Sequence, residues 1–167
     1  GTTTLSANTS IVGGNLSVTT GTLDMSTFTI NRSAGGGTLT VSNGATLKIG
    51  STNPFPTNYT TKTLGATSTV EFAGAAQTVA TESYGNLKLS GSGTKTFSAL
   101  TTIAGELAIT GTAKATFPNT TVSTANSLKL SGYSQASGTY GGTGSGATNI
   151  NTSYFNATTN GRISIAS

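Results

Sequence analysis

The chain has 167 residues, enough for one domain or one elongated unit with a buried core, and eight Lys and Arg against four Asp and Glu give a net charge of +4. Only 7% of the residues are charged, far fewer than in a typical soluble globular domain. The absence of cysteine and histidine excludes disulfides, thiolate metal sites and histidine-based catalysis. The scattered cations argue against nucleic-acid binding, and no apolar run is long enough for a membrane span.

Hydroxyl side chains dominate the polar composition. Thr (37), Ser (21) and Gly (23) together make up almost half of the chain. A surface of hydroxyls and amides is typical of secreted and cell-surface β-proteins, so we expect this localisation. Leu, Ile, Val and Phe recur at regular intervals, which disfavours disorder. Because the chain starts at Gly1 without Met or a signal peptide, we expect a processed product or a part of something longer.

Pairs of large apolar residues separated by one residue recur along the chain. The residue between them is mostly polar, so each pair predicts a short strand with one buried and one wet face. In chain order the pairs are Leu16/Val18, Leu23/Met25, Phe28/Ile30, Leu39/Val41, Leu47/Ile49, Val70/Phe72, Leu87/Leu89, Leu107/Ile109, Leu128/Leu130 and Ile163/Ile165.

A repeated phrase sets the period of these strands. Gly-Asn-Leu begins residues 14–18 and 85–89, and variants of it begin residues 105–109 and 126–130. Strands that return every 20 to 21 residues, each followed by a glycine corner, predict an all-β fold: a right-handed parallel β-helix (β-solenoid) with coils of about 20 residues over residues 1–130. An antiparallel β-sandwich is the alternative, since short strands with frequent turns also describe one.

Two segments interrupt the period. Residues 51–59 contain Pro54 and Pro56 and predict a loop bulging from one coil, in which Phe55 and Tyr59 either anchor the loop or form a binding surface. Residues 131–167 are rich in Gly and Ser and predict an irregular C-terminal cap or a junction to the next module. The tyrosines of this tail are further candidates for contacts with a ligand such as a sugar; they are Tyr133, Tyr140 and Tyr154.

A family resemblance rests on residues 70–79 and 84–96, and on residues 138–142, 146–149 and 154–155 of the tail. The first two segments resemble repeats in very large secreted surface proteins of Bacteroidetes-type bacteria. The tail resembles module ends in gliding-motility adhesins of that group. The resemblance implies an extracellular, non-enzymatic segment of an adhesin, filament or surface layer, exported by the host's own secretion system, and it supplies no catalytic residues.

The acidic residues do not predict an active site. Polysaccharide lyases and glycosidases built on β-helices need paired carboxylates, whereas Asp24, Glu71, Glu82 and Glu106 are far apart in sequence. If coils stack in register, Glu106 lies beside Asn86 at a hydrogen-bonded corner. No phosphate-binding loop is present among the glycines. We therefore predict a protein that is not an enzyme and that has no metal or cofactor site.

The predicted role is that of a stalk, spacer or filament subunit. Its predicted partners are other copies joined end to end or neighbouring modules, and surface glycans. The alternative is a glycan- or ice-binding β-solenoid. Eight Thr-x-Thr spacings suggest ice binding, but they recur without the coil period, which argues against it. We expect most asparagines to form turns or corner ladders of stacked amides.

Overall fold

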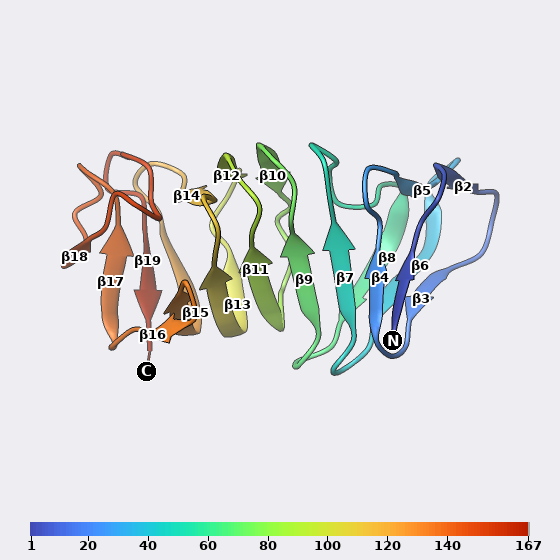
Figure 1. The fold of residues 1–167 in the computed structure, drawn as a ribbon, viewed down its shortest axis with the longest axis horizontal. Helices are drawn as coiled ribbons and strands as arrows, with labels where there is room; N and C mark the ends of the chain where they lie inside the picture. The colour runs from blue at the N-terminus through green and yellow to red at the C-terminus, as the bar shows by residue number, and fades with distance from the viewer. Residues whose placement is uncertain (167) are drawn as a thin grey trace.

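The computed structural model describes residues 1–166 as an all-β rod of stacked parallel coils, a β-solenoid of about six turns (Figure 1). The predicted β-solenoid is confirmed, and the antiparallel sandwich is wrong. The N-terminus lies near one end of the rod and the C-terminus near the other (Figure 1). Among residues 1–166 no helix has the length and apolar character needed to cross a membrane.

Three columns of strands run along the rod, and the first column is the longest. Its strands pair in parallel with a spacing that varies from 17 residues (Thr69 to Asn86) to 24 (Thr22 to Thr46). In order, they are β1 (Thr2–Thr4), β4 (Thr22–Asp24), β7 (Thr46–Ile49), β9 (Thr69–Phe72), β11 (Asn86–Leu89), β13 (Thr102–Ile109) and β15 (Val122–Leu130).

The second and third columns are interrupted. The second consists of β2 (Thr9–Ile11) with β5 (Ile30–Arg32), and then β10 (Gln77–Val79), β12 (Thr94–Phe97) and β14 (Lys114–Thr116). The third begins with β3 (Leu16–Val18), β6 (Gly36–Val41) and β8 (Tyr59–Leu64). Strands β13 and β15 bend around a corner, so that their first halves continue the third column; the register shift between Ile103 and Glu106 marks the bend.

The apolar pairs fill the space between the columns. Leu23, Leu47, Val70 and Leu87 stand at matching register positions of successive coils. In the central coils the pair members are at most 1% exposed, whereas Leu23 near the N-terminal end is only partly buried. Full burial of each such side chain contributes about 1.5–3 kcal/mol. The alternation predicted from the sequence therefore becomes a continuous apolar column.

Close stacking at one corner requires glycine. A Cβ added to Gly74 would overlap the carbonyl oxygen of Ser51 in the preceding coil. One coil further on, Gly91 has a φ of +72°, which L-residues with a Cβ rarely adopt. The glycines after the strands thus permit both the turn and the close approach of neighbouring coils.

The proline-containing segment does not bulge away from the rod as expected. Residues 51–58 form no strand, and β8 begins at Tyr59. Asn53 donates a hydrogen bond to the Phe28 carbonyl (2.8 Å), and the Thr57 N–H donates to Asn31 Oδ1 (2.9 Å). Phe55 is buried beneath it. The segment occupies the place of a strand in the second column, and side-chain amides replace part of the ladder that proline cannot form.

The chain leaves the coil path after residue 130. Strand β16 (Tyr133–Ser134) turns back antiparallel along β15, and β17 (Gly138–Gly141) carries β18 (Asn149–Ile150) at its edge. The last strand, β19 (Arg162–Ile165), pairs in parallel with the first half of β15 and antiparallel with β17. The tail thus covers the C-terminal coils and buries Tyr140 and Phe155 against them.

Candidate functional site

Three of the five aromatic candidates are buried, which favours the anchoring alternative and is contrary to their use as a binding surface. Phe55, Tyr59 and Tyr140 are 5%, 4% and 5% exposed. Tyr140 Oη donates to the Ala136 carbonyl (2.8 Å). Burial raises the pKa of Tyr59 although the nearby Arg32 charge lowers it in part. These rings anchor the proline segment and the tail.

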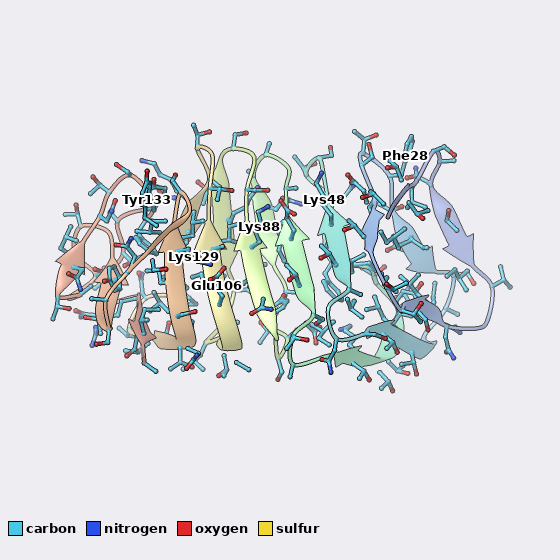
Figure 2. The ribbon with its side chains drawn as sticks, turned by 60° about the horizontal axis from the view of Figure 1, so that its bottom comes forward. Phe28, Lys48, Lys88, Glu106, Lys129 and Tyr133 are labelled. Carbon is cyan, nitrogen blue, oxygen red and sulfur yellow. The ribbon has the colours of Figure 1, made fainter. Side chains whose placement is uncertain are left out.

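The other two candidates lie in the tail and differ in exposure. Tyr154 is partly buried, and its hydroxyl donates to Ser131 Oγ (2.7 Å), which ties the tail to the corner after β15. Tyr133 is 77% exposed and therefore remains available to a partner (Figure 2). The five candidates thus do not converge into one site.

Each of the four acids forms an ion pair with a lysine. The nitrogen–oxygen distances are 2.9 Å for Lys48–Asp24, 2.6 Å for Lys62–Glu82, 3.2 Å for Lys88–Glu71 and 2.8 Å for Lys129–Glu106. No group of three metal-ligating side chains occurs within residues 1–166. Each carboxylate is therefore in contact with an ammonium group, whereas acid–base hydrolysis of a glycoside uses a pair of carboxylates.

Three of these pairs lie on the outer side of the first column, named here the charged face. At one register position the outward residues alternate in sign: Asp24, Lys48, Glu71 and Lys88 follow one another on successive coils, then Ala108 and Lys129. Figure 2 shows Lys48, Lys88 and Lys129 along this face, with Glu106 beside Lys129. Opposite charges on adjacent strands stabilise the stack, by about 0.2–1 kcal/mol per pair.

The N-terminal end of this row has shifted pKa values. Burial raises the pKa of Asp24, but hydrogen bonds from Lys48 and the Ser26 N–H, together with the Lys48 charge, lower it more, so that it lies below its usual value. The same hydrogen bond raises the pKa of Lys48 against the effect of its burial. Both shifts hold the pair charged at neutral pH.

The four remaining cations donate to backbone carbonyls. Because the other four are each paired with an acid, these four carry the net charge of the chain. Arg32 donates to the carbonyls of Gly14 and Ala34, and Lys114 donates to that of Thr152 (2.7 Å). Arg162 donates to the Ser145 and Asn160 carbonyls (both 3.2 Å). Arg32 thus joins turns of neighbouring coils, Lys114 joins a coil to the tail, and Arg162 links segments within the tail.

Lys95 is the most buried of the cations. It is 0% exposed and donates to the carbonyls of Gly74 (2.8 Å), Ala75 and Ser92 (3.2 Å) and to Gln77 Oε1 (3.0 Å). Burial lowers its pKa to about 8. Because oxygen atoms of the protein surround the ammonium group, Lys95 stabilises a corner and is closed to an external substrate.

Asparagines tie each corner to the next coil. The Oδ1 of Asn86 accepts the N–H of Glu106 (2.9 Å), as the in-register stacking predicted. The same contact recurs at five other corners, where the asparagines are Asn8, Asn15, Asn31, Asn43 and Asn119. The expected stacks of amide on amide are replaced by amide-to-backbone bonds, which satisfy N–H groups that the turns leave unpaired.

Two Thr-x-Thr spacings do stack at the coil period, contrary to the sequence interpretation. Thr38 pairs with Thr61 and Thr40 with Thr63 on β6 and β8, and Ser17 of β3 lies in register with Thr40. Thr61 and Thr63 are exposed, and Thr38 and Thr40 are partly exposed. This group is named here the hydroxyl array. The signal was present in the sequence as the 23-residue separation of the two spacings.

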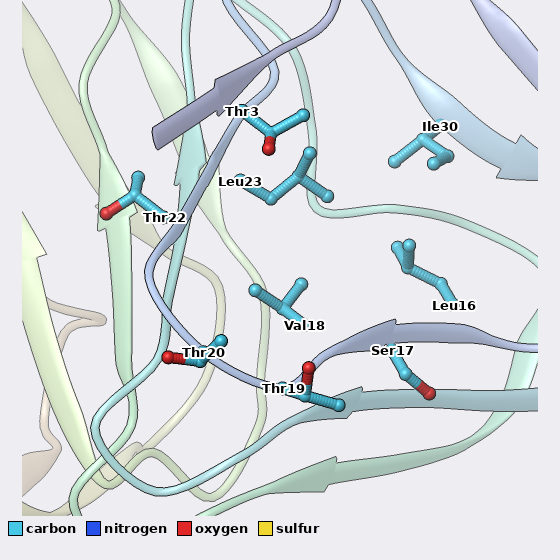
Figure 3. Close-up of a pocket in the computed structure, with 9 residues that line it drawn as sticks. All are labelled: Thr3, Leu16, Ser17, Val18, Thr19, Thr20, Thr22, Leu23 and Ile30. Atoms are coloured by element: carbon cyan, nitrogen blue, oxygen red, sulfur yellow. The ribbon is translucent and has the colours of Figure 1, made fainter. Parts of the chain in front are cut away.

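Three hollows are shallow and differ in character. The first, of about 290 Å³, lies in the coil nearest the N-terminus, where Leu16, Val18, Leu23 and Ile30 are flanked by threonines (Figure 3). The second, of about 350 Å³, lies on the charged face around Ala108 and Glu106. The third, of about 210 Å³, is lined mainly by threonines of the second column.

No protein-family model, curated protein or solved structure matches this chain.

Proposed function

We propose that this chain is a non-enzymatic, extracellular rod that serves as a structural or adhesive segment of a bacterial surface protein, as a stalk, spacer or filament subunit. The observation that carries the proposal is the use of every charged side chain for cohesion: each acid pairs with a lysine, and each remaining cation binds backbone carbonyls. A stack in which reactive groups bridge coils suits a load-bearing or spacing element.

Surface location is the part of the proposal that a direct experiment tests. Antibodies against the rod should label intact cells that make the protein, and brief protease treatment of those cells should remove the label. Labelling only after the cells are opened would contradict the extracellular role. A cytoplasmic protein detected on the same blots controls for lysis.

Absence of catalysis is tested with polysaccharide substrates and a matched pair of variants. We expect no release of reducing ends, with or without Glu106→Gln or Glu71→Gln. Turnover that either substitution abolished, while Glu82→Gln on the third column left it intact, would establish an enzyme instead.

Binding to ice or to a glycan is the second candidate function, and the hydroxyl array favours it. Its hydroxyls repeat at about 4.8 Å between coils and about 6.6 Å along each strand, a regular spacing suited to an ordered surface. Thermal hysteresis that is lost in Thr61→Tyr and Thr40→Tyr, but kept in Thr139→Tyr of the tail, would support ice binding. On a glycan array, signal that requires Tyr133 would support a sugar ligand.

A further inference from the structure

The charged face has a sequence of charges that is complementary to itself when reversed. Including the neutral ends, its outward register position reads, from the first coil to β16, Thr4, Asp24, Lys48, Glu71, Lys88, Ala108, Lys129 and Ser134. The second residue from the first end is the acid Asp24, and the second residue from the other end is Lys129. The two central residues are the acid Glu71 and Lys88. No charged residue has a like charge at the mirrored place.

Two rods related by a twofold axis parallel to the strands would bring these mirrored places together. Such an axis reverses the order of the coils but keeps the direction of the strands, so the same register position faces itself. Asp24 of one copy then faces Lys129 of the other, and Glu71 faces Lys88. Each contact occurs twice. A twofold axis along the rod would instead set every charge against itself.

The hollow around Ala108 gives this arrangement a second fit. Ala108 is the one small residue between Lys88 and Lys129, and the hollow there is lined by Lys88 and Leu87 as well as by Thr69, Asn86 and Glu106. The mirrored residue is Lys48, which has 36% of its side chain accessible, somewhat less than Lys88 (41%) and Lys129 (42%). In the antiparallel arrangement the Lys48 side chain of one copy enters the hollow of the other, and its ammonium group approaches the Glu106 carboxylate.

The other outward register position of the charged face offers no obstacle. It carries Thr22, Thr46, Thr69, Asn86, Glu106 and Ser127, of which only Glu106 is charged. Thr46 is the mirrored place of Glu106, so the carboxylate meets a hydroxyl group and the incoming Lys48. Short polar side chains along this row allow the two faces to approach each other.

We propose that the charged face binds a second copy of this chain in an antiparallel, twofold-symmetric dimer. Eight rungs of about four residues present roughly 450 Å² per copy, and the roughly 900 Å² buried in total is below the usual range for stable complexes. The dimer is therefore weak and dissociates as salt screens the charges. The inference goes beyond the proposed surface role and does not require it, because the charged face lies on the side of the rod.

Sedimentation velocity over a concentration series tests the dimer. At low ionic strength the chain should shift from monomer to dimer with rising concentration and stop at two copies, and high salt should reverse the shift. Glu71→Lys and Lys88→Glu each place two like-charged contacts in the dimer, so each should raise the dissociation constant about tenfold or more. An equimolar mixture of the two variants should dimerise as the parent does, since both contacts then join opposite charges.

Controls separate association from folding. The double variant Glu71→Lys/Lys88→Glu keeps the ion pair within each chain and both contacts between chains, so it should dimerise even if a single variant is unstable. Glu82→Lys, which breaks an ion pair on the third column, should leave the dissociation constant unchanged. A monomer at every concentration in low salt would overturn the proposal. So would single variants that associate like the parent, or species that grow beyond two copies.

Discussion

Lys95 Nζ donates a hydrogen bond to Gln77 Oε1 across 3.0 Å, and the two residues stand at matching, inward-facing positions of consecutive coils. Gln77 in turn accepts the Gly74 N–H and donates to the carbonyls of Ile49 and Asn53. A polar pair thus replaces the apolar pair at the corner where glycines let three coils approach closely. The energy gained by satisfying buried carbonyls offsets the cost of burying an ammonium group.

Lys95→Met should therefore destabilise the rod. The substitution keeps an unbranched side chain up to the ε carbon but leaves the Ala75 and Ser92 carbonyls without the ammonium donor, so we expect a loss of about 1–3 kcal/mol in the free energy of unfolding at pH 7. Urea unfolding followed by tyrosine fluorescence measures it, since the chain has five Tyr and no Trp. Lys114→Met, which removes one exposed bond to Thr152, is the matched control and should cost less.

The same lysine gives the stability an unusual dependence on pH. Burial lowers the pKa of Lys95 to about 8, whereas the same lysine has a pKa of 10.5 in the unfolded chain. Between these values the unfolded state binds the proton that the native state has released, so this group makes unfolding more costly as the pH rises. The difference in free energy of unfolding between the parent and Lys95→Met should grow from pH 7 to pH 10.5. If the free energies of unfolding of the two proteins changed with pH in parallel, the pKa of the Lys95 ammonium group would not be lowered in the native state.

At the acid end, the Asp24–Lys48 pair should contribute a dependence of the same sign, with stability rising as the pH rises. The pKa of Asp24 is lowered below its usual 3.8, so its stabilising effect is complete above that value and is lost as the pH falls through the lower native value. Asp24→Asn should be less stable than the parent at pH 6, and the two should converge towards pH 2. Denaturant unfolding at both pH values checks this. A constant difference between the two proteins would contradict it.

The strands and the stacking followed from the sequence because both depend on local chemistry. An apolar pair such as Leu87/Leu89 can bury itself only in an extended segment, and its return at Leu107/Ile109 fixes the register of two coils. That register alone placed Glu106 beside Asn86. The second and third columns were harder to predict, because coil lengths of 17 to 24 residues blur the period.

The candidate site was predicted less well, for a physical reason. Tyr59 and Tyr140 stand beside proline- and glycine-rich sequence that carries no strand pattern, so their burial could not be predicted, yet Tyr59 begins β8, Tyr140 lies in β17 and both are buried. Lys95 could not be singled out, since its neighbours in sequence are Thr94 and Thr96 and its oxygen partners come mostly from the preceding coil. Contacts between coils depend on register to within one residue, and composition does not supply that.

Asn86→Ala should test how much the corner amides contribute. The substitution removes the acceptor of the Glu106 N–H at a partly buried corner, so we expect a loss of about 1–2 kcal/mol. Asn126→Ala is the control, because Asn126 lies at the same corner of a later coil and is exposed. It should change the free energy of unfolding by less than about 0.5 kcal/mol. Equal effects of the two substitutions would mean that the hydrogen bond between the Glu106 N–H and the Asn86 side chain does not stabilise the rod.

Gly74→Ala should be among the most damaging small substitutions in the rod. Its backbone has no positive φ, so the cost arises from space alone: the new Cβ would overlap the Ser51 carbonyl oxygen, and that atom cannot move without breaking the ladder to Ala75. We expect a loss of about 3 kcal/mol or more. Gly35→Ala is the control, since its Cβ would meet nothing within 4 Å. It should be neutral or slightly stabilising, because alanine restricts the unfolded chain. Thermal unfolding followed by far-ultraviolet circular dichroism compares the two variants, and a Gly74→Ala variant as stable as Gly35→Ala would contradict the close stacking of coils at this corner.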